Sequence, residues 1–205
     1  MTPTLKPVLT DLLAKQSAKR RSAAKKLRKL ADVEAGAPLL AALRAEVDDP
    51  RTWETQYQMI MALGESGYAE SSKFIEELSN RVLDTTMVYV AIGDALVRLA
   101  GDKGVMTLLG FIAEDRHPSL IDGALRAAAM LRIVPEDDEI SAILEYASGL
   151  PKDDGNRFWI LAACPGWPAE KIAGFLNDVG KSSRADFQEA LQLARAGKYK
   201  TWRPL

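Results

Sequence analysis

The sequence has few of the residues on which most catalytic and metal sites are built. It holds one cysteine, Cys164, and one histidine, His117, among 205 residues. A single cysteine excludes a disulfide within the chain and is typical of a reducing compartment, so we expect a cytoplasmic protein. A single histidine excludes any site that needs two imidazoles. Glycine-rich phosphate loops and Cys-x-x-Cys pairs are also missing. We therefore expect no enzymatic activity, no metal, no cofactor and no small-molecule substrate.

Long apolar runs are missing as well. The longest uncharged run, Phe158 to Ala169, has 12 residues and includes two prolines, whereas a membrane-spanning helix needs about 20 apolar residues. The first residues show no basic segment leading into an apolar one, so no secretory signal is predicted. Hydrophobic residues make up 47% of the chain and charged residues 27%, which is enough for one domain with a buried core. We expect no membrane partner.

Acidic residues are absent between Leu12 and Ala31, although the net charge of the chain is only −1. Residues 1–32 carry +7 and the remaining residues carry −8. On a helical wheel one arc of this segment is basic and the opposite arc is mostly alanine and leucine. The basic arc holds Arg21, Lys25, Lys26, Arg28 and Lys29. These side chains could contact phosphates, meet an acidic protein, or simply solvate the outer surface of a terminal repeat.

Helical patterns follow one another along the whole chain, and strand-like alternation is missing. Amphipathic segments of about ten to sixteen residues are separated by short breakers that contain Gly, Pro, Asp or Ser. The residues near the end of every other segment recur at intervals of 30–36 residues: Leu30, Leu63, Leu99, Leu131, Ala163 and Leu193. One helical pair cannot bury its own apolar stripe, so this period predicts pairs that stack on one another.

The repeated unit reads Ala-Ala-x-x-Leu-x-x-Leu over residues 23–30, then a short Asp/Gly turn and Leu-x-x-Leu over residues 40–43. This pattern resembles HEAT or armadillo-type repeats over about residues 19–180, and HEAT repeats fit the two-helix unit better. The resemblance implies an all-α fold, a right-handed α-solenoid of about five helical hairpins with a terminal half repeat.

The whole chain, 1–205, is expected to form this single domain. An N-terminal helix or cap is predicted over 1–18, the repeats over 19–180, and a C-terminal cap helix and tail over 181–205.

Proteins with such repeats are mostly binding scaffolds. The resemblance therefore implies a non-catalytic scaffold, adaptor or regulatory protein that binds another protein on a curved helical surface. The alternative is a nucleic-acid-binding module that uses the basic helix. Alkylpurine DNA glycosylases and bilin lyases have related repeats, but an excision enzyme of this type would need a Trp/Asp/Arg pocket on the concave side of a basic protein. No local motif of that kind is visible. In HEAT-like proteins the second helices line the concave side, and acidic residues follow those helices here.

The second repeat opens on aromatic and polar residues that form a candidate protein-binding patch: Trp53, Glu54, Tyr57 and Gln58. Trp and Tyr dominate the residues that contribute most to binding at protein interfaces. Alternatively, the two aromatic rings pack between repeats while their polar tips reach the backbone, Arg20 or Arg21.

Three further residues are expected to be structural. His117 precedes a proline at a repeat junction and is predicted to cap a helix. Cys164 follows an apolar run and is predicted to be a buried thiol rather than a nucleophile. Trp202 in the tail is expected to dock against the last helix pair, with stacking on a base or a partner as the alternative.

Overall fold

The computed structural model describes residues 5–202, and every regular element within them is an α-helix or a short 3-10 turn, which confirms the all-α prediction. The helices are α1 (Leu5–Asp11), α2 (Ser17–Leu30), α3 (Gly36–Glu46), α4 (Trp53–Ser66), α5 (Ser72–Ser79), α6 (Thr86–Ala100), α7 (Gly104–Ala113), α8 (Pro118–Leu131), α9 (Asp137–Ser148), α10 (Gly155–Ala163), α11 (Ala169–Val179) and α12 (Ala185–Arg195).

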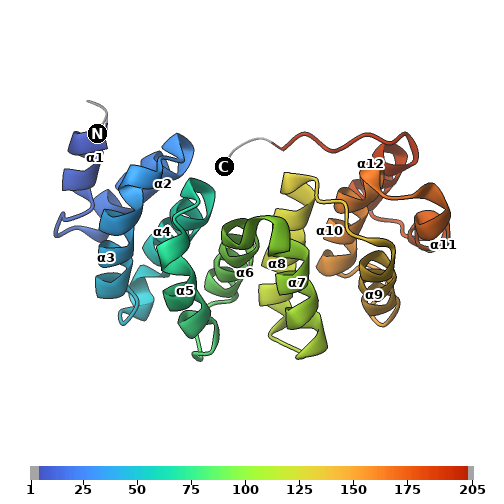
Figure 1. Cartoon of the computed structure of the whole chain (residues 1–205), viewed down its shortest axis with the longest axis horizontal. Helices are drawn as coiled ribbons and strands as arrows, with labels where there is room; N and C mark the ends of the chain where they lie inside the picture. The colour runs from blue at the N-terminus through green and yellow to red at the C-terminus, as the bar shows by residue number, and fades with distance from the viewer. Residues whose placement is uncertain (1–4, 203–205) are drawn as a thin grey trace.

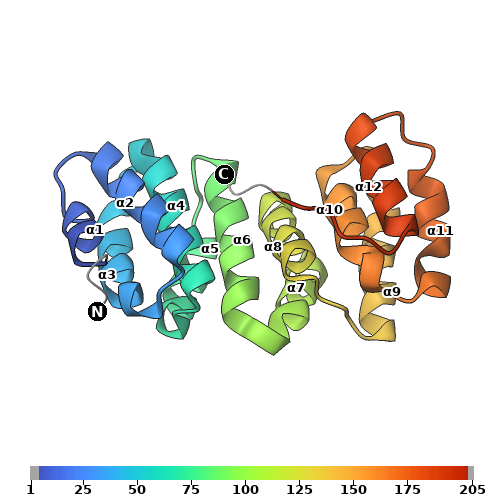
Figure 2. The same cartoon turned by 90° about the horizontal axis from the view of Figure 1, so that it is seen from above.

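The helices follow one another in chain order along an elongated molecule (Figure 1). Helices α2, α4, α6, α8, α10 and α12 each contact the next member of the series, and we call them the first-helix row. Helices α3, α5, α7 and α9 lie beside them in a second row (Figure 2). After α12 the chain turns back, and residues 196–202 run along α10 towards the middle of the molecule (Figures 1 and 2).

The helix boundaries agree with the predicted repeat units, with small shifts. Helix α2 begins at Ser17, two residues before the predicted start of the repeats, and α12 occupies the predicted half repeat. Asp49, Thr85 and His117 each accept a hydrogen bond from a backbone N–H at a helix start. These caps satisfy amides that have no partner inside the helix.

The residues chosen as repeat anchors are not equally buried. Leu63 is fully buried, whereas Leu30 and Leu131 are 44% and 45% exposed. Both exposed leucines are the last residues of their helices, and each is followed by a residue with positive φ, Ala31 or Arg132. The chain turns away from the core at that point, so these two leucines mark the end of a helix, whereas Leu63 is a core position.

Helices α6 and α8 approach each other most closely at two glycines. A Cβ on Gly93 would lie 2.0 Å from the carbonyl oxygen of Leu120, and a Cβ on Gly123 would lie 2.0 Å from that of Val90. The two backbones are therefore in direct contact, which only glycine permits at these positions.

Candidate binding face

Two hollows open on the first-helix row, and Arg28 lines both of them. Hollow 1 has a volume of about 560 Å³ and lies between α2, α4 and the start of α6. Hollow 2 has a volume of about 910 Å³ and is bounded by α2, α4, α8, α10 and the C-terminal segment. The two hollows therefore adjoin on one face of the molecule.

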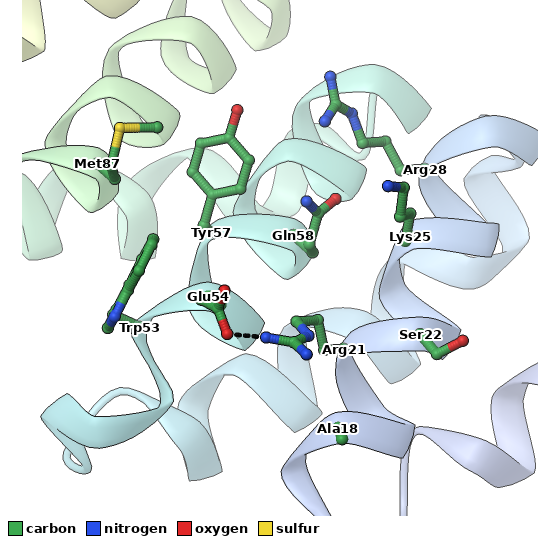
Figure 3. Close-up of a pocket in the computed structure, with 10 residues that line it drawn as sticks. All are labelled: Ala18, Arg21, Ser22, Lys25, Arg28, Trp53, Glu54, Tyr57, Gln58 and Met87. Carbon is green, nitrogen blue, oxygen red and sulfur yellow. Dashed lines mark ion pairs between the residues drawn. The ribbon is translucent and has the colours of Figure 1, made fainter. Parts of the chain in front are cut away.

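Hollow 1 brings together the two groups of residues that the sequence singled out separately. Trp53, Glu54, Tyr57 and Gln58 all lie on α4. They share one side of that helix, because residues three and four apart are neighbours on a helix surface. They face Arg21, Lys25 and Arg28 of α2 across the hollow (Figure 3).

Carboxylates neutralise much of the positive charge around hollow 1. Arg21 forms an ion pair with Glu54 (Figure 3). The Nε of Arg28 donates to Oε1 of Glu65 at 2.9 Å. Within residues 5–202, the buried Nη1 of Arg28 and the buried Oε1 of Gln58 have no hydrogen-bond partner. The hollow thus offers one unused donor, one unused acceptor and charges of both signs.

The five basic residues of the first repeat are divided between the two hollows and the surface beside them. Lys29 lines hollow 2 and Lys26 lines neither hollow, although both are exposed. Successive residues on a helix are turned by about 100°, so neighbouring basic residues of α2 point in different directions. That all five act as one basic surface stays a prediction.

The two aromatic residues of hollow 1 differ in accessibility. Trp53 is 36% exposed, whereas Tyr57 is only 7% exposed. The hydroxyl of Tyr57 accepts a hydrogen bond from Nη1 of Arg126 at 3.2 Å, rather than meeting Arg20 or Arg21. Arg20 instead pairs with the buried carboxylate of Glu46 at 2.7 Å. Trp53 therefore remains available to a partner, and Tyr57 belongs largely to the core.

A buried ion-pair network connects the two hollows. Asp94 of α6 has no exposed surface; its Oδ1 accepts from Arg98 at 2.6 Å and its Oδ2 from Arg126 at 3.1 Å. Arg126 lies on α8 and reaches across α6 to Tyr57 on α4. Burial acts to lower the pKa of Arg126, but Asp94 and Tyr57 outweigh it and raise the pKa above the ordinary value. The guanidinium therefore stays charged.

Hollow 2 is lined by five cations and by one carboxylate, Glu65. The cations are Arg28, Lys29, Arg126, Arg132 and Lys200. Two indoles complete the lining: the ring centroids of Trp159 and Trp202 lie 5.0 Å apart at an interplanar angle of 42°. Trp202 also meets Phe158 edge-on, so the tail docks on α10 much as predicted.

The sequence analysis missed three residues of this face: Arg126, Arg132 and Trp159. A usable signal was present, since Asp94, Arg126 and Trp159 lie 32 and 33 residues apart, which is one repeat. Residues one repeat apart occupy equivalent places in neighbouring units. The sequence has no local motif of Trp, Asp and Arg. The fold nevertheless brings together Asp94 of α6, Arg126 of α8 and Trp159 of α10.

The carboxylates of Asp94 and Asp122 make structural contacts within the protein. Both oxygens of Asp94 are bound by guanidinium groups. Asp122 is hydrogen-bonded by the side chain of Trp159, and burial raises its pKa above the ordinary value. Neither residue is among those that line the hollows. Arg126 and Trp159, which they contact, do line hollow 2.

The second row offers a different surface. Its hollow, between α7 and α9, has a volume of about 440 Å³ and is lined mostly by apolar residues, with Glu145 as the one acid. The hollow between α7 and α9 is therefore apolar rather than acidic.

The residues expected to be structural behave as predicted. The ring of His117 stacks on Tyr89 at 4.1 Å, and its Nδ1 accepts from the backbone N–H of Ser119. Cys164 is fully buried, and burial raises the pKa of its thiol to about 12. A thiol with this pKa stays protonated near neutral pH and is a poor nucleophile.

Residues 5–202 contain no cluster of His, Cys, Asp or Glu suited to a metal ion. None of the helices in this range combines the length and the apolar character that crossing a bilayer requires. No protein-family model, curated protein or solved structure matches the chain. The resemblance to HEAT repeats therefore stays a prediction that rests on the residues of this sequence.

Proposed function

We propose that this protein is a non-catalytic binding scaffold and that hollow 1 receives a segment of another protein. The observation that carries the proposal is the exposed indole of Trp53 beside charges of both signs and the unused polar atoms of Arg28 and Gln58. A polypeptide presents donors, acceptors and apolar side chains within a few residues. It therefore matches a mixed lining of this kind.

The same proposal includes the finer description of the fold. Two rows of helices with a period of 30–36 residues support a right-handed α-solenoid of HEAT type. A cytoplasmic location belongs to the proposal as well, supported by the single cysteine and its burial.

A protein segment fits hollow 1 better than a nucleic acid does. Glu54 and Glu65 place carboxylates beside Arg21 and Arg28, where they would repel a phosphate backbone. Outside residues 1–32 the chain carries −8, so a long duplex would meet repulsion beyond the basic helix. Binding of nucleic acid through the basic helix is the second candidate, and the same experiment tests it.

The test is selection of random twelve-residue peptides on the immobilised full chain, followed by affinity measurements on the enriched peptides. We expect peptides with acidic and aromatic residues, and we expect Trp53→Ala to weaken their binding about tenfold or more. The matched control is Lys73→Glu, which changes an exposed lysine on α5.

Equal binding of the enriched peptides to wild type and Trp53→Ala would refute the proposal. Salt-sensitive binding of labelled duplex DNA or RNA that is lost on changing Arg21, Lys25 and Arg28 to Glu would favour the second candidate. Melting curves of each variant separate lost binding from lost folding.

A further inference from the structure

We infer that hollow 2 binds a nucleotide, that is, a ligand with a flat base next to a phosphate, either free or as one unit of a single strand. This inference concerns a site other than hollow 1 and goes beyond the proposed scaffold function. It rests on the charges, the aromatic rings and the size of hollow 2.

The charge of hollow 2 is positive and is only partly compensated. Arg126 is paired with Asp94 and Lys200 with Glu189, which leaves three of the five cations to consider. Glu65 is the one carboxylate in the lining, and it is bonded to Arg28. Lys29 is exposed and has no carboxylate partner within residues 5–202. Arg132 is also exposed, and its guanidinium lies over the ring of Tyr199 at 5.0 Å. Lys29 and Arg132 can therefore turn to an incoming phosphate, and the planar guanidinium matches two phosphate oxygens at once.

The aromatic rings of hollow 2 are held in place from behind. The side chain of Trp159 is hydrogen-bonded to Asp122, and the ring packs edge-on against Phe158. Trp202 packs against the same two rings, and Nζ of Lys200 lies 5.8 Å from the centre of the Trp202 ring. Both indoles line the hollow, so each can present surface to a flat base. Stacking on an aromatic side chain tolerates any base, because every base has a π-face.

The volume of hollow 2 also fits a nucleotide. A hollow of about 910 Å³ lies in the range of ordinary ligand sites, roughly 300–1,000 Å³. An acidic peptide would use the cations but would gain nothing specific from two adjacent indoles. A ligand that carries both concentrated negative charge and a flat ring uses both features, which is why we favour a nucleotide.

The experiment is a titration of the whole chain at about 50 mM salt, in which binding is measured by tryptophan fluorescence and by calorimetry. The probes are adenosine monophosphate, adenosine, inorganic phosphate, a single-stranded oligonucleotide of twelve residues, and hexaglutamate. We expect saturable binding of adenosine monophosphate with quenching of tryptophan fluorescence, and at least tenfold weaker binding of adenosine and of phosphate. Much tighter binding of the oligonucleotide would identify a strand as the ligand, and equal binding would identify the free nucleotide; both support the inference.

The variants assign the binding to hollow 2. Trp202→Ala should weaken binding about tenfold, and the double change Lys29→Glu with Arg132→Glu should weaken it at least as much. Trp53→Ala and Lys73→Glu should leave it unchanged, so failure here is distinguishable from failure of the hollow 1 proposal. The inference is overturned if neither the nucleotide nor the oligonucleotide binds, if hexaglutamate binds as tightly as they do, or if the hollow 2 variants bind like wild type.

Discussion

Hollows 1 and 2 lie on the same row of helices and share Arg28, yet they differ in how their charges are used. In hollow 1 the guanidinium groups of Arg21 and Arg28 are each paired with a carboxylate. In hollow 2 Arg126 and Lys200 are paired as well, with Asp94 and Glu189, whereas Lys29 and Arg132 have no carboxylate partner in the described part of the chain. Within the basic segment of the sequence, Arg21 and Arg28 are thus paired with carboxylates, whereas Lys29 is not. Pairing, rather than the count of basic residues, decides where positive charge remains available to a ligand.

The largest effect is expected from Arg126, because it contributes to both hollows at once. Arg126→Met leaves the buried carboxylate of Asp94 with Arg98 alone and frees the hydroxyl of Tyr57. We expect a loss of about 3 kcal/mol in the free energy of unfolding, measured by urea denaturation. The control is Asp94→Asn combined with Arg126→Met, which removes the buried carboxylate and leaves only Arg98, whose side chain is 14% exposed, without its partner, so it should recover part of the loss. If both variants are as stable as wild type, the network does not hold the two hollows together.

Cys164 directly follows α10, the helix that carries Trp159 of hollow 2. Its reactivity therefore reports whether this part of the molecule opens. With its pKa raised to about 12, its thiolate fraction at pH 8 is about a thousandfold lower than that of a thiol with the ordinary pKa of 9.0. We therefore expect Cys164 to react with a disulfide reagent at least a thousandfold more slowly in the folded protein than in urea. Trp53→Ala should not change the folded rate. Fast labelling of the folded protein would show that the region around Cys164 opens readily.

Glu65 offers a way to sharpen the contrast between the hollows. Glu65→Gln removes the one carboxylate of hollow 2 and releases Arg28, so the affinity for adenosine monophosphate should rise about three- to tenfold. Glu54→Gln is the matched change in hollow 1 and should leave that affinity unaltered. Calorimetry at one salt concentration measures both. Equal changes in the two variants would mean that the hollows do not act as separate sites.

The smallest effect is expected at Asp122, behind Trp159. Burial raises the pKa of this carboxyl above its ordinary value of 3.8, so the folded state binds the proton more tightly than the unfolded state. The contribution of Asp122 to stability therefore falls as pH rises from 3.8 through the raised pKa. Asp122→Asn should remove this pH dependence and leave the protein at pH 7 as stable as wild type or slightly more so. Urea midpoints at pH 4.5 and pH 7 provide the measurement, and a variant less stable at pH 7 would contradict the prediction.

The elements could be predicted from the sequence because their signals are local. Apolar spacing, caps such as Asp49 and His117, and the repeat period identify the helices and their order. The membership of each hollow could not be predicted in the same way. Arg126 reaches Tyr57 across an intervening helix, and Trp202 returns from the tail to meet Trp159. Such contacts depend on how closely helices pack and where the chain turns, which no window of sequence contains.

Gly93 and Gly123 fix how closely α6 and α8 pack against each other. Arg126 spans from α8 to α4, so the reach of its side chain must match the combined width of the helices that it crosses. A methyl group at Gly93 or Gly123 would push α6 and α8 apart, and the distance between Arg126 and Tyr57 would lengthen with them. The width of hollow 2, which α8 lines, thus depends on the lack of a side chain at Gly93 and Gly123. A family of such chains could retune what it recognises by changing residues far from any bound partner.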